Sequence, residues 1–191
     1  ERADRSRRIR NRPRLLKAVV LQVRLARVEE ADRFCEIEDD AGMLFATAQG
    51  YEWIAELGNR APEEWAAAAR EGLCWAADNE DRQTVGVVAA RAIGADLFIV
   101  ELAVTMAEQG RGSGGRLLDA VEAHARSKDL RAVTLTTFRD VPWNGPAYTR
   151  RGYAPVAPEG MPPYLREILA EEAANGLPAD LRCAMELVLG R

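Results

Sequence analysis

The sequence predicts a mixed α/β (α+β) domain with one central sheet, mostly antiparallel, of about six or seven strands and with helices on its faces. Three observations predict this class. Two short apolar runs flank a turn signal and predict a hairpin, and a third apolar run leads through a glycine cluster into an amphipathic helix. A further β-rich run follows that helix. A doubly wound fold would instead alternate strands and helices along the whole chain.

Length and composition predict one domain. The chain has 191 residues, of which 48% are hydrophobic, enough for a sizeable core. We assign residues 18–191 to this domain and residues 1–17 to a basic N-terminal extension that we expect to be flexible. There is no apolar run of about 18 residues and no signal-peptide apolar region, so we expect a cytoplasmic protein outside the membrane. Cys35, Cys74 and Cys183 lack metal-ligand spacing, which predicts reduced, buried thiols and no metal.

The net charge of −4 conceals an asymmetry between the two ends of the chain. Residues 1–17 hold eight basic and two acidic side chains, whereas the remaining 174 hold 18 basic and 28 acidic ones. A flexible extension explains the basic segment more simply than a nucleic-acid arm, so we expect no nucleic-acid partner. The acidic body would draw a cationic substrate toward a cleft lined by carboxylates, although acidic surfaces also serve solubility.

The first half of the chain predicts a strand, two helices and a hairpin. The strand covers residues 19–26, and a helix follows at 29–38 and ends at Gly42. The second helix, at 62–70, has a proline in its first turn. The runs 73–77 and 84–92 flank the polar turn 78–81 and form the hairpin.

The stretch 97–125 organises the rest of the chain. Residues 97–104 suit a buried strand in which Glu101 is the one charged residue. The helix that follows places its apolar residues on one stripe and is preceded by a glycine-rich loop. Glycines allow left-handed backbone angles and close approach to amides, and the helix N-terminus adds unpaired N–H groups. The sequence therefore predicts an anion cradle for a phosphate or pyrophosphate, rather than only a flexible turn.

Two familiar phosphate motifs do not match this loop. A P-loop requires a lysine after its glycines, and a dinucleotide fingerprint requires glycines at G-x-G-x-x-G. The loop resembles instead the acyl-CoA signature Gln/Arg-x-x-Gly-x-Gly/Ala of the GCN5-related N-acetyltransferases, met by Gln109, Gly112 and Gly114. A second element, Tyr148-x-x-x-Gly152-Tyr153, resembles the Tyr-x-x-x-Gly-Phe/Tyr element of that family, and its tyrosine lies on a short helix.

This resemblance implies a fold and a set of acetyl-CoA contacts. In the family the fourth and fifth strands are parallel and splay apart, and the acyl-pantetheine lies between them. Asn144 resembles the asparagine that holds the pantetheine arm, although it lies closer to the tyrosine than in many relatives. The resemblance implies that the thioester contacts the fourth strand at Leu102, Ala103 and Val104. It implies that the pyrophosphate contacts the loop residues Gln109, Gly110, Arg111, Gly112, Ser113, Gly114 and Gly115.

The chemistry implied is direct attack of a primary amine on acetyl-CoA in a ternary complex. Tyr148, with an ordinary pKa near 10, could protonate the departing thiolate. Many relatives carry a glutamate on the fifth strand, but residues 135–137 here are Leu-Thr-Thr. Glu101 is therefore the candidate base, and the alternative is a structural carboxylate paired with an arginine such as Arg139. His124, in the middle of a helix, is expected to be structural.

The acceptor cannot be identified from motifs. In the resembling family the region after the first helix forms one wall of the acceptor cleft, although its aromatic residues could be ordinary core. The acidic body favours a small polycation such as an aminoglycoside antibiotic or a polyamine. Alternatives are a peptide acceptor or a non-catalytic acyl-CoA-binding module. A homodimer is plausible in the family. The candidate acceptor residues are Glu38, Asp39, Tyr51, Trp53 and Trp143.

The last part of the chain completes the sheet. Residues 132–138 follow the organising helix and should run parallel to 97–104. A strand at 153–156, a helix at about 164–175 and a strand at 181–189 follow, with Gly176 as a helix C-cap. Glu167, Glu171 and Glu172 on that helix border the acceptor site or form a solvated acidic face.

Overall fold

The computed structural model describes residues 21–58 and 60–190. Within these ranges, seven strands form one sheet in the order β1-β2-β3-β4-β5-β7-β6. All neighbouring strands are antiparallel except β4 and β5, which are parallel as predicted. The strands are β1 (Gln22–Leu25), β2 (Cys74–Asp78), β3 (Thr84–Ile93), β4 (Asp96–Val104), β5 (Ala132–Phe138), β6 (Ala154–Pro155) and β7 (Arg182–Val188).

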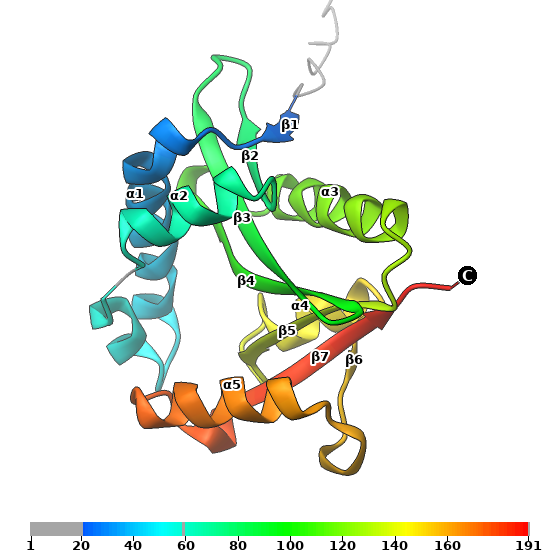
Figure 1. Cartoon of the computed structure of the whole chain (residues 1–191). Helices are drawn as coiled ribbons and strands as arrows, with labels where there is room; N and C mark the ends of the chain where they lie inside the picture. The colour runs from blue at the N-terminus through cyan, green and yellow to red at the C-terminus, as the bar shows by residue number, and fades with distance from the viewer. Residues whose placement is uncertain (1–20, 59, 191) are drawn as a thin grey trace, which may run out of the picture.

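Helices cover both faces of this sheet (Figure 1). The helices α1 (Ala31–Gly42) and α2 (Pro62–Arg70) pack on one face, where α5 (Pro163–Ala174) also lies. The organising helix α3 (Ser113–Ser127) packs on the opposite face, and the short α4 (Gly145–Arg150) contributes Tyr148 to the same core cluster. Short 3₁₀ helices lie in the connections: η1 (Val28–Glu30), η2 (Met43–Thr47), η3 (Glu52–Glu56), η4 (Met106–Glu108), η5 (Pro158–Gly160) and η6 (Ala179–Leu181).

Most predicted boundaries are confirmed to within one or two residues, and three differ. The helix predicted at 29–38 begins two residues later and continues to Gly42, because the preceding turn is 3₁₀. The first strand begins at Gln22, and Val19 and Val20 lie outside the described residues. The strand predicted at 153–156 contains only two residues, since Pro155 has no N–H to extend the ladder.

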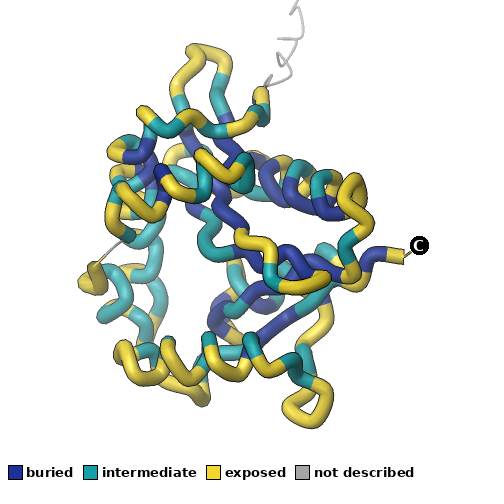
Figure 2. Tube along the Cα trace, viewed as in Figure 1, coloured by how far each residue is buried: buried dark blue, intermediate teal, exposed yellow. Residues whose placement is uncertain are grey.

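The core is divided by the sheet into clusters on its two faces, and buried residues follow the strands (Figure 2). The α3 stripe predicted from sequence is buried in the larger cluster, with Leu117, Val121 and Ala125 wholly inaccessible. Phe34 of α1 and Trp65 of α2 fill the cluster on the other face, with ring centroids 5.6 Å apart. Leu165 of α5 packs there on Phe98.

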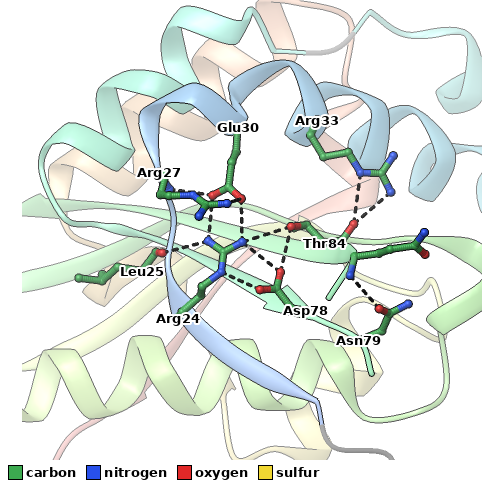
Figure 3. A network of polar contacts seen from close by, with 9 residues as sticks. Arg24, Leu25, Arg27, Glu30, Arg33, Asp78, Asn79 and Thr84 are labelled. Atoms are coloured by element: carbon green, nitrogen blue, oxygen red, sulfur yellow. Dashed lines mark hydrogen bonds and ion pairs between the residues drawn. The ribbon is translucent and has the colours of Figure 1, made fainter. Parts of the chain in front are cut away.

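A polar network fixes the start of α1 on the sheet (Figure 3). Arg24 of β1 donates two hydrogen bonds to Glu30, at 2.7 and 2.9 Å, and two to Asp78 of β2, at 2.7 and 3.1 Å. Thr84 of β3 donates to the same Asp78 carboxylate at 2.9 Å. Because Glu30 immediately precedes α1, these contacts determine where the helix lies over β2 and β3.

The cysteines agree only in part with the prediction. Cys74 is buried, whereas Cys35 and Cys183 are partly exposed, and all three are free thiols. The basic segment 1–17 lies outside the described residues. Within the described part of the chain, no helix combines the length and the apolar character that crossing a membrane requires.

Candidate functional site

The strands β4 and β5 separate part of the way along their length. Their parallel pairing runs from Asp96 opposite Ala132 to Ile99 opposite Leu135 and then ends. Beyond this point β4 continues to Val104 and β5 to Phe138, and the two ribbons diverge (Figure 1). The open part of this V leaves one side of β4 unpaired, so its backbone groups are available to a ligand.

A β-bulge in β4 decides which face Glu101 occupies. Ala89 of β3 pairs with Glu101 and the next residue of β3 pairs with Ile99, so Val100 is extra. Ile99 lies on the α3 face, and strict alternation would put Glu101 there too. With the extra residue, Leu102 takes that place instead. The Glu101 carboxylate thus lies on the face that α1 and α2 cover.

The glycine loop has the backbone geometry of an anion cradle. Gly110 and Gly112 have φ values of +72° and +90°, in the region that favours glycine. Gly112 is the N-cap of α3, and the Arg116 amide donates the first helical hydrogen bond to its carbonyl at 3.1 Å. The amides of residues 113–115 precede this bond and therefore have no partner within the helix.

The other predicted loop residues surround these amides. Gln109 donates from Nε2 to the Val104 carbonyl at 3.0 Å, which ties the loop to the end of β4. Arg111 is exposed and lies 3.4 Å from a Glu108 carboxylate oxygen. A Cβ at Gly114 or Gly115 would make ordinary van der Waals contact at 3.8 Å, whereas a Cβ at Gly110 or Gly112 would have no neighbour within 4 Å.

Three buried polar atoms around the V lack a hydrogen-bond partner among the described residues. These atoms are Ser113 Oγ at the start of α3, Glu108 Oε2 in η4 and Asn144 Oδ1 before α4. The amide nitrogen of Asn144 is occupied, because Nδ2 donates to Thr137 Oγ1 at 3.0 Å. Unpaired buried polar atoms are rare in folded proteins, and here a polar ligand with donors and acceptors along its length would complete them. The residues therefore fit a CoA-type ligand.

The helix α4 places Tyr148 beside the V. Gly145 begins this helix, and a Cβ there would collide with the Arg139 carbonyl, so only glycine allows α4 to lie this close to the end of β5. The Tyr148 ring packs against Tyr153 at 5.5 Å between centroids. Burial, together with the negative charge of Glu101, raises the pKa of Tyr148 well above its ordinary value. The phenol is therefore protonated at neutral pH.

Two carboxylates contact Arg60 on the opposite face of the V, one through its guanidinium and one through its backbone amide. Glu101 lies 3.7 Å from Arg60, and Glu38 of α1 accepts the Arg60 amide at 3.3 Å and Trp65 Nε1 at 3.2 Å. Burial and the charge of Glu101 raise the pKa of Glu38 to about 7. Burial also raises the pKa of Glu101, although 32% of its side chain is exposed. The Glu101 side chain is therefore partly accessible from solvent.

A second carboxylate and arginine approach the V from α5 and β7. Glu172 of α5 accepts two hydrogen bonds from Arg182, at 2.8 and 3.0 Å, and one from Thr136 Oγ1 of β5 at 2.5 Å. The charges of Glu172 and Arg182 act on the Glu101 carboxyl in opposite directions. Of the three glutamates considered on this helix, Glu172 is half-buried, whereas Glu167 and Glu171 are exposed.

An aromatic cluster gathers around the end of β5. Phe138, the last residue of β5, contacts the rings of Phe45, Tyr51 and Trp53 at centroid distances of 5.5, 5.5 and 6.5 Å. Trp143 packs on Phe45 at 5.6 Å and is 36% exposed. Among these five rings only that of Phe138 is buried; Phe45, Tyr51 and Trp53 are partly exposed and Trp143 is exposed.

Some contacts in the structure differ from those expected from the sequence. Arg139 donates to the Arg182 carbonyl and not to Glu101, whose ion-pair partner is Arg60. The sequence analysis did not single out Arg60, because the loop before α2 has no motif. Asp39 is exposed on α1.

His124 packs edge-on against Trp75 at 5.3 Å, which is a structural contact. Within residues 21–58 and 60–190, no group of three potential ligands could hold a metal ion.

Comparisons with known proteins identify the family and the fold. A model of the Acetyltransferase (GNAT) family matches residues 30–153. The PaiA N-acetyltransferase of Thermoplasma acidophilum, solved with coenzyme A, is similar with a TM-score of 0.66 and 14% identity, covering 88% of this chain and 99% of that one. A GNAT-family acetyltransferase of Staphylococcus aureus has a TM-score of 0.62 and 13% identity, covering 89% and 99%.

A longer relative is also similar. The N-acetylglutamate synthase of Neisseria gonorrhoeae, complexed with coenzyme A and N-acetyl-glutamate, has a TM-score of 0.66 and 18% identity. The match covers 90% of this chain but 35% of that protein, so this chain spans about a third of its length. At such identities these structures share the fold.

Proposed function

The chain belongs to the acetyltransferase (GNAT) family and is an N-acetyltransferase that uses acetyl-CoA, and we propose that its acceptor is a small amine that arrives as a cation. The observation that carries this proposal is the carboxylate pair beside the V. The Arg60 guanidinium pairs with Glu101, its backbone amide donates to Glu38, and its positive charge acts on both carboxyls. When both carboxyls are ionised they repel each other across the site, and an acceptor ammonium between them would stabilise the pair.

The donor supplies an acetyl group on a thioester. We assign its pyrophosphate to the glycine loop, where the amides of residues 113–115 and the positive end of α3 stabilise negative charge. The unpaired Oδ1 of Asn144 would accept a hydrogen bond from the pantetheine arm. The free backbone of Leu102, Ala103 and Val104 along the open edge of β4 would hold the thioester carbonyl, a contribution of a few kcal/mol to catalysis.

Two side chains move the protons. In our proposal Glu101 takes a proton from the acceptor ammonium, because its raised pKa makes it a stronger base than an ordinary carboxylate. Glu38, with a pKa of about 7, is about half ionised at neutral pH, and its ionised form binds the acceptor ammonium. Tyr148 keeps its proton on Oη and delivers it to the thiolate as the C–S bond breaks. The second proton, which the nitrogen loses as the amide forms, restores the phenol.

Polyamines and aminoglycosides are the first acceptors to test, since they combine primary amines with multiple positive charges. The aromatic wall of Tyr51, Trp53 and Trp143 supports such a ligand through cation–π contact and would equally line a groove for a peptide. Amino acids join the panel because one similar structure holds N-acetyl-glutamate.

The test is release of free CoA thiol from acetyl-CoA in the presence of polyamines, aminoglycosides, amino acids or short peptides. We expect turnover with one cationic class. Tyr148→Phe should lower kcat by roughly 10²-fold or more, the usual contribution of a general acid, and retain CoA binding by calorimetry. Tyr164→Phe is the control, because this hydroxyl bonds Asp96 and Thr134 away from the V. CoA binding without turnover with any amine would favour the non-catalytic module.

A further inference from the structure

The helix α3 carries a buried carboxylate, that of Glu122. This residue is 7% exposed, and its neighbours on the helix, Leu118 and Ala125, belong to the larger core cluster. A leucine would suit such a position, whereas an ionised carboxylate is costly to bury unless partners bind it. The partners of Glu122 therefore indicate what the carboxylate does.

One oxygen of this carboxylate joins α3 to the end of α4. Glu122 Oε1 accepts a hydrogen bond from Arg151 Nε at 2.6 Å and another from Tyr153 Oη at 3.2 Å. The other oxygen, Oε2, lies 4.0 Å from the exposed Arg126. Burial, together with the negative charge of Glu122, raises the pKa of Tyr153 well above its ordinary value. The Tyr153 phenol is therefore protonated at neutral pH and donates to the carboxylate.

Arg151 and Tyr153 flank the glycine that ends the helix carrying Tyr148. Gly152 has a φ of +101°, and its amide donates to the Thr149 carbonyl at 3.0 Å. The Tyr153 amide donates to the Tyr148 carbonyl at 3.1 Å, and the two rings lie 5.5 Å apart between centroids. These two bonds and the ring contact form a Schellman motif. Tyr153 thus fixes both the backbone and the ring of Tyr148.

From these contacts we propose that Glu122 is a positioning residue, which holds the Tyr148 hydroxyl at the thioester by anchoring the residues on both sides of Gly152. The inference rests on the proposed function, in which Tyr148 delivers a proton to the thiolate. The first turn of α3 is the proposed pyrophosphate site, and Glu122 lies roughly 14 Å further along the same helix. One helix thus fixes both the phosphate end of the donor and the acid that protonates its sulfur.

The test is a double-mutant cycle in the thiol-release assay on the full chain. Glu122→Leu suits the apolar neighbours and leaves Arg151 paired with Asp119 at 2.6 Å, so we expect the fold to be retained. It should lower kcat about tenfold or more with the Kd of CoA unchanged, because a small displacement of a reacting group is enough for such a loss. In the Tyr148→Phe background the same substitution should change kcat less than about twofold, since the hydroxyl that Glu122 positions is absent.

Two further variants separate position from charge and from general stability. Asp119→Leu is the matched control, because Asp119 contacts the same guanidinium but 69% of its side chain is exposed, and kcat should stay within about twofold of the wild type. Glu122→Gln keeps an oxygen that accepts from Arg151 Nε and Tyr153 Oη, so it should retain most of kcat.

A crystal structure of Glu122→Leu with CoA bound gives a readout that needs no acceptor. We expect the Tyr148 ring to be displaced from its place beside the V, whereas Asp119→Leu should keep it there. An unmoved ring, a full kcat in Glu122→Leu, equal losses in Glu122→Leu and Glu122→Gln, or the same loss with and without the Tyr148 hydroxyl would each overturn the inference. A displaced ring with no turnover by the wild-type protein would support the inference and count against the proposed function alone.

Discussion

Substituting Glu38 by glutamine should make the protein more stable above pH 7 while removing a carboxylate from the cleft. The folded protein raises the pKa of this carboxyl from 4.5 to about 7, mainly through burial, with the Glu101 charge adding to it. The native state therefore holds the proton more tightly than the unfolded chain. The free energy of unfolding falls as the pH rises from about 4.5 to about 7, because over this window the native state binds more protons.

The size of the effect follows from the same values. A pKa change from 4.5 to about 7 corresponds to roughly 3 kcal/mol at most, and in a chain of this length it would move Tm by about 6–12 °C. The side-chain amide introduced by Glu38→Gln would keep an oxygen that accepts Trp65 Nε1 and the Arg60 amide, so the hydrogen bonds are retained. The difference in unfolding free energy between Glu38→Gln and the wild type should grow by that amount between pH 4 and pH 8.

Urea unfolding at several pH values measures this difference directly. Glu36→Gln is the control, because Glu36 lies on the same helix with 65% of its side chain exposed and its removal leaves the Glu38–Glu101 pair intact. A difference between Glu38→Gln and the wild type that is the same at pH 4 and pH 8 would refute the reasoning. It would mean that Glu38 ionises as easily in the folded protein as in water and that the carboxylate pair is not electrostatically coupled.

Three further substitutions test how the site is held. Gly145→Ala should lower kcat in the thiol-release assay by about 10²-fold, because the new Cβ meets the Arg139 carbonyl and displaces α4; an unchanged kcat would contradict this role. Gly112→Ala places a side chain at φ +90° and should weaken CoA binding by calorimetry and cost about 1 kcal/mol of stability, whereas unchanged affinity would argue against the cradle. Arg24→Ala should cost about 3 kcal/mol in urea unfolding, because it leaves Asp78 without an arginine and Glu30 with only the exposed Arg27. Arg27→Ala should cost under about 1 kcal/mol, because Arg27 is 68% exposed; equal costs would contradict the network.

The parts of the site that sequence reasoning reached are those where local chemistry determines local structure. The strand, glycine loop and amphipathic helix between residues 97 and 125 form one continuous unit, and each piece has its own signal in composition and periodicity. The short helix with Tyr148 was reached through the resemblance of Tyr148-x-x-x-Gly152-Tyr153 to a family element. These segments require no knowledge of distant contacts, and the structure places them with small differences in their ends.

The face of the sheet on which Glu101 lies could not be predicted from the local sequence. Alternation along β4 predicts one face, and the bulge at Val100 moves the carboxylate to the other. No glycine or proline marks this bulge, because it arises from the pairing of β4 with β3 and not from the residues of β4 themselves. The same limit applies to Arg60, whose position follows from the loop between η3 and α2.

The carboxylate beside β5, that of Glu172, comes from a distant part of the chain. Residues 135–137 offer no acidic side chain, yet Thr136 donates to Glu172, which lies 36 positions further along the chain. The helix α5 is held at its other end by Tyr164, whose hydroxyl donates to Asp96 at 2.9 Å, so the helix is fixed over β5 from both ends. Glu172 therefore reaches the strand through tertiary packing. A carboxylate that acts on the charge of Glu101 can be supplied from outside the strand, and only the folded chain reveals where it comes from.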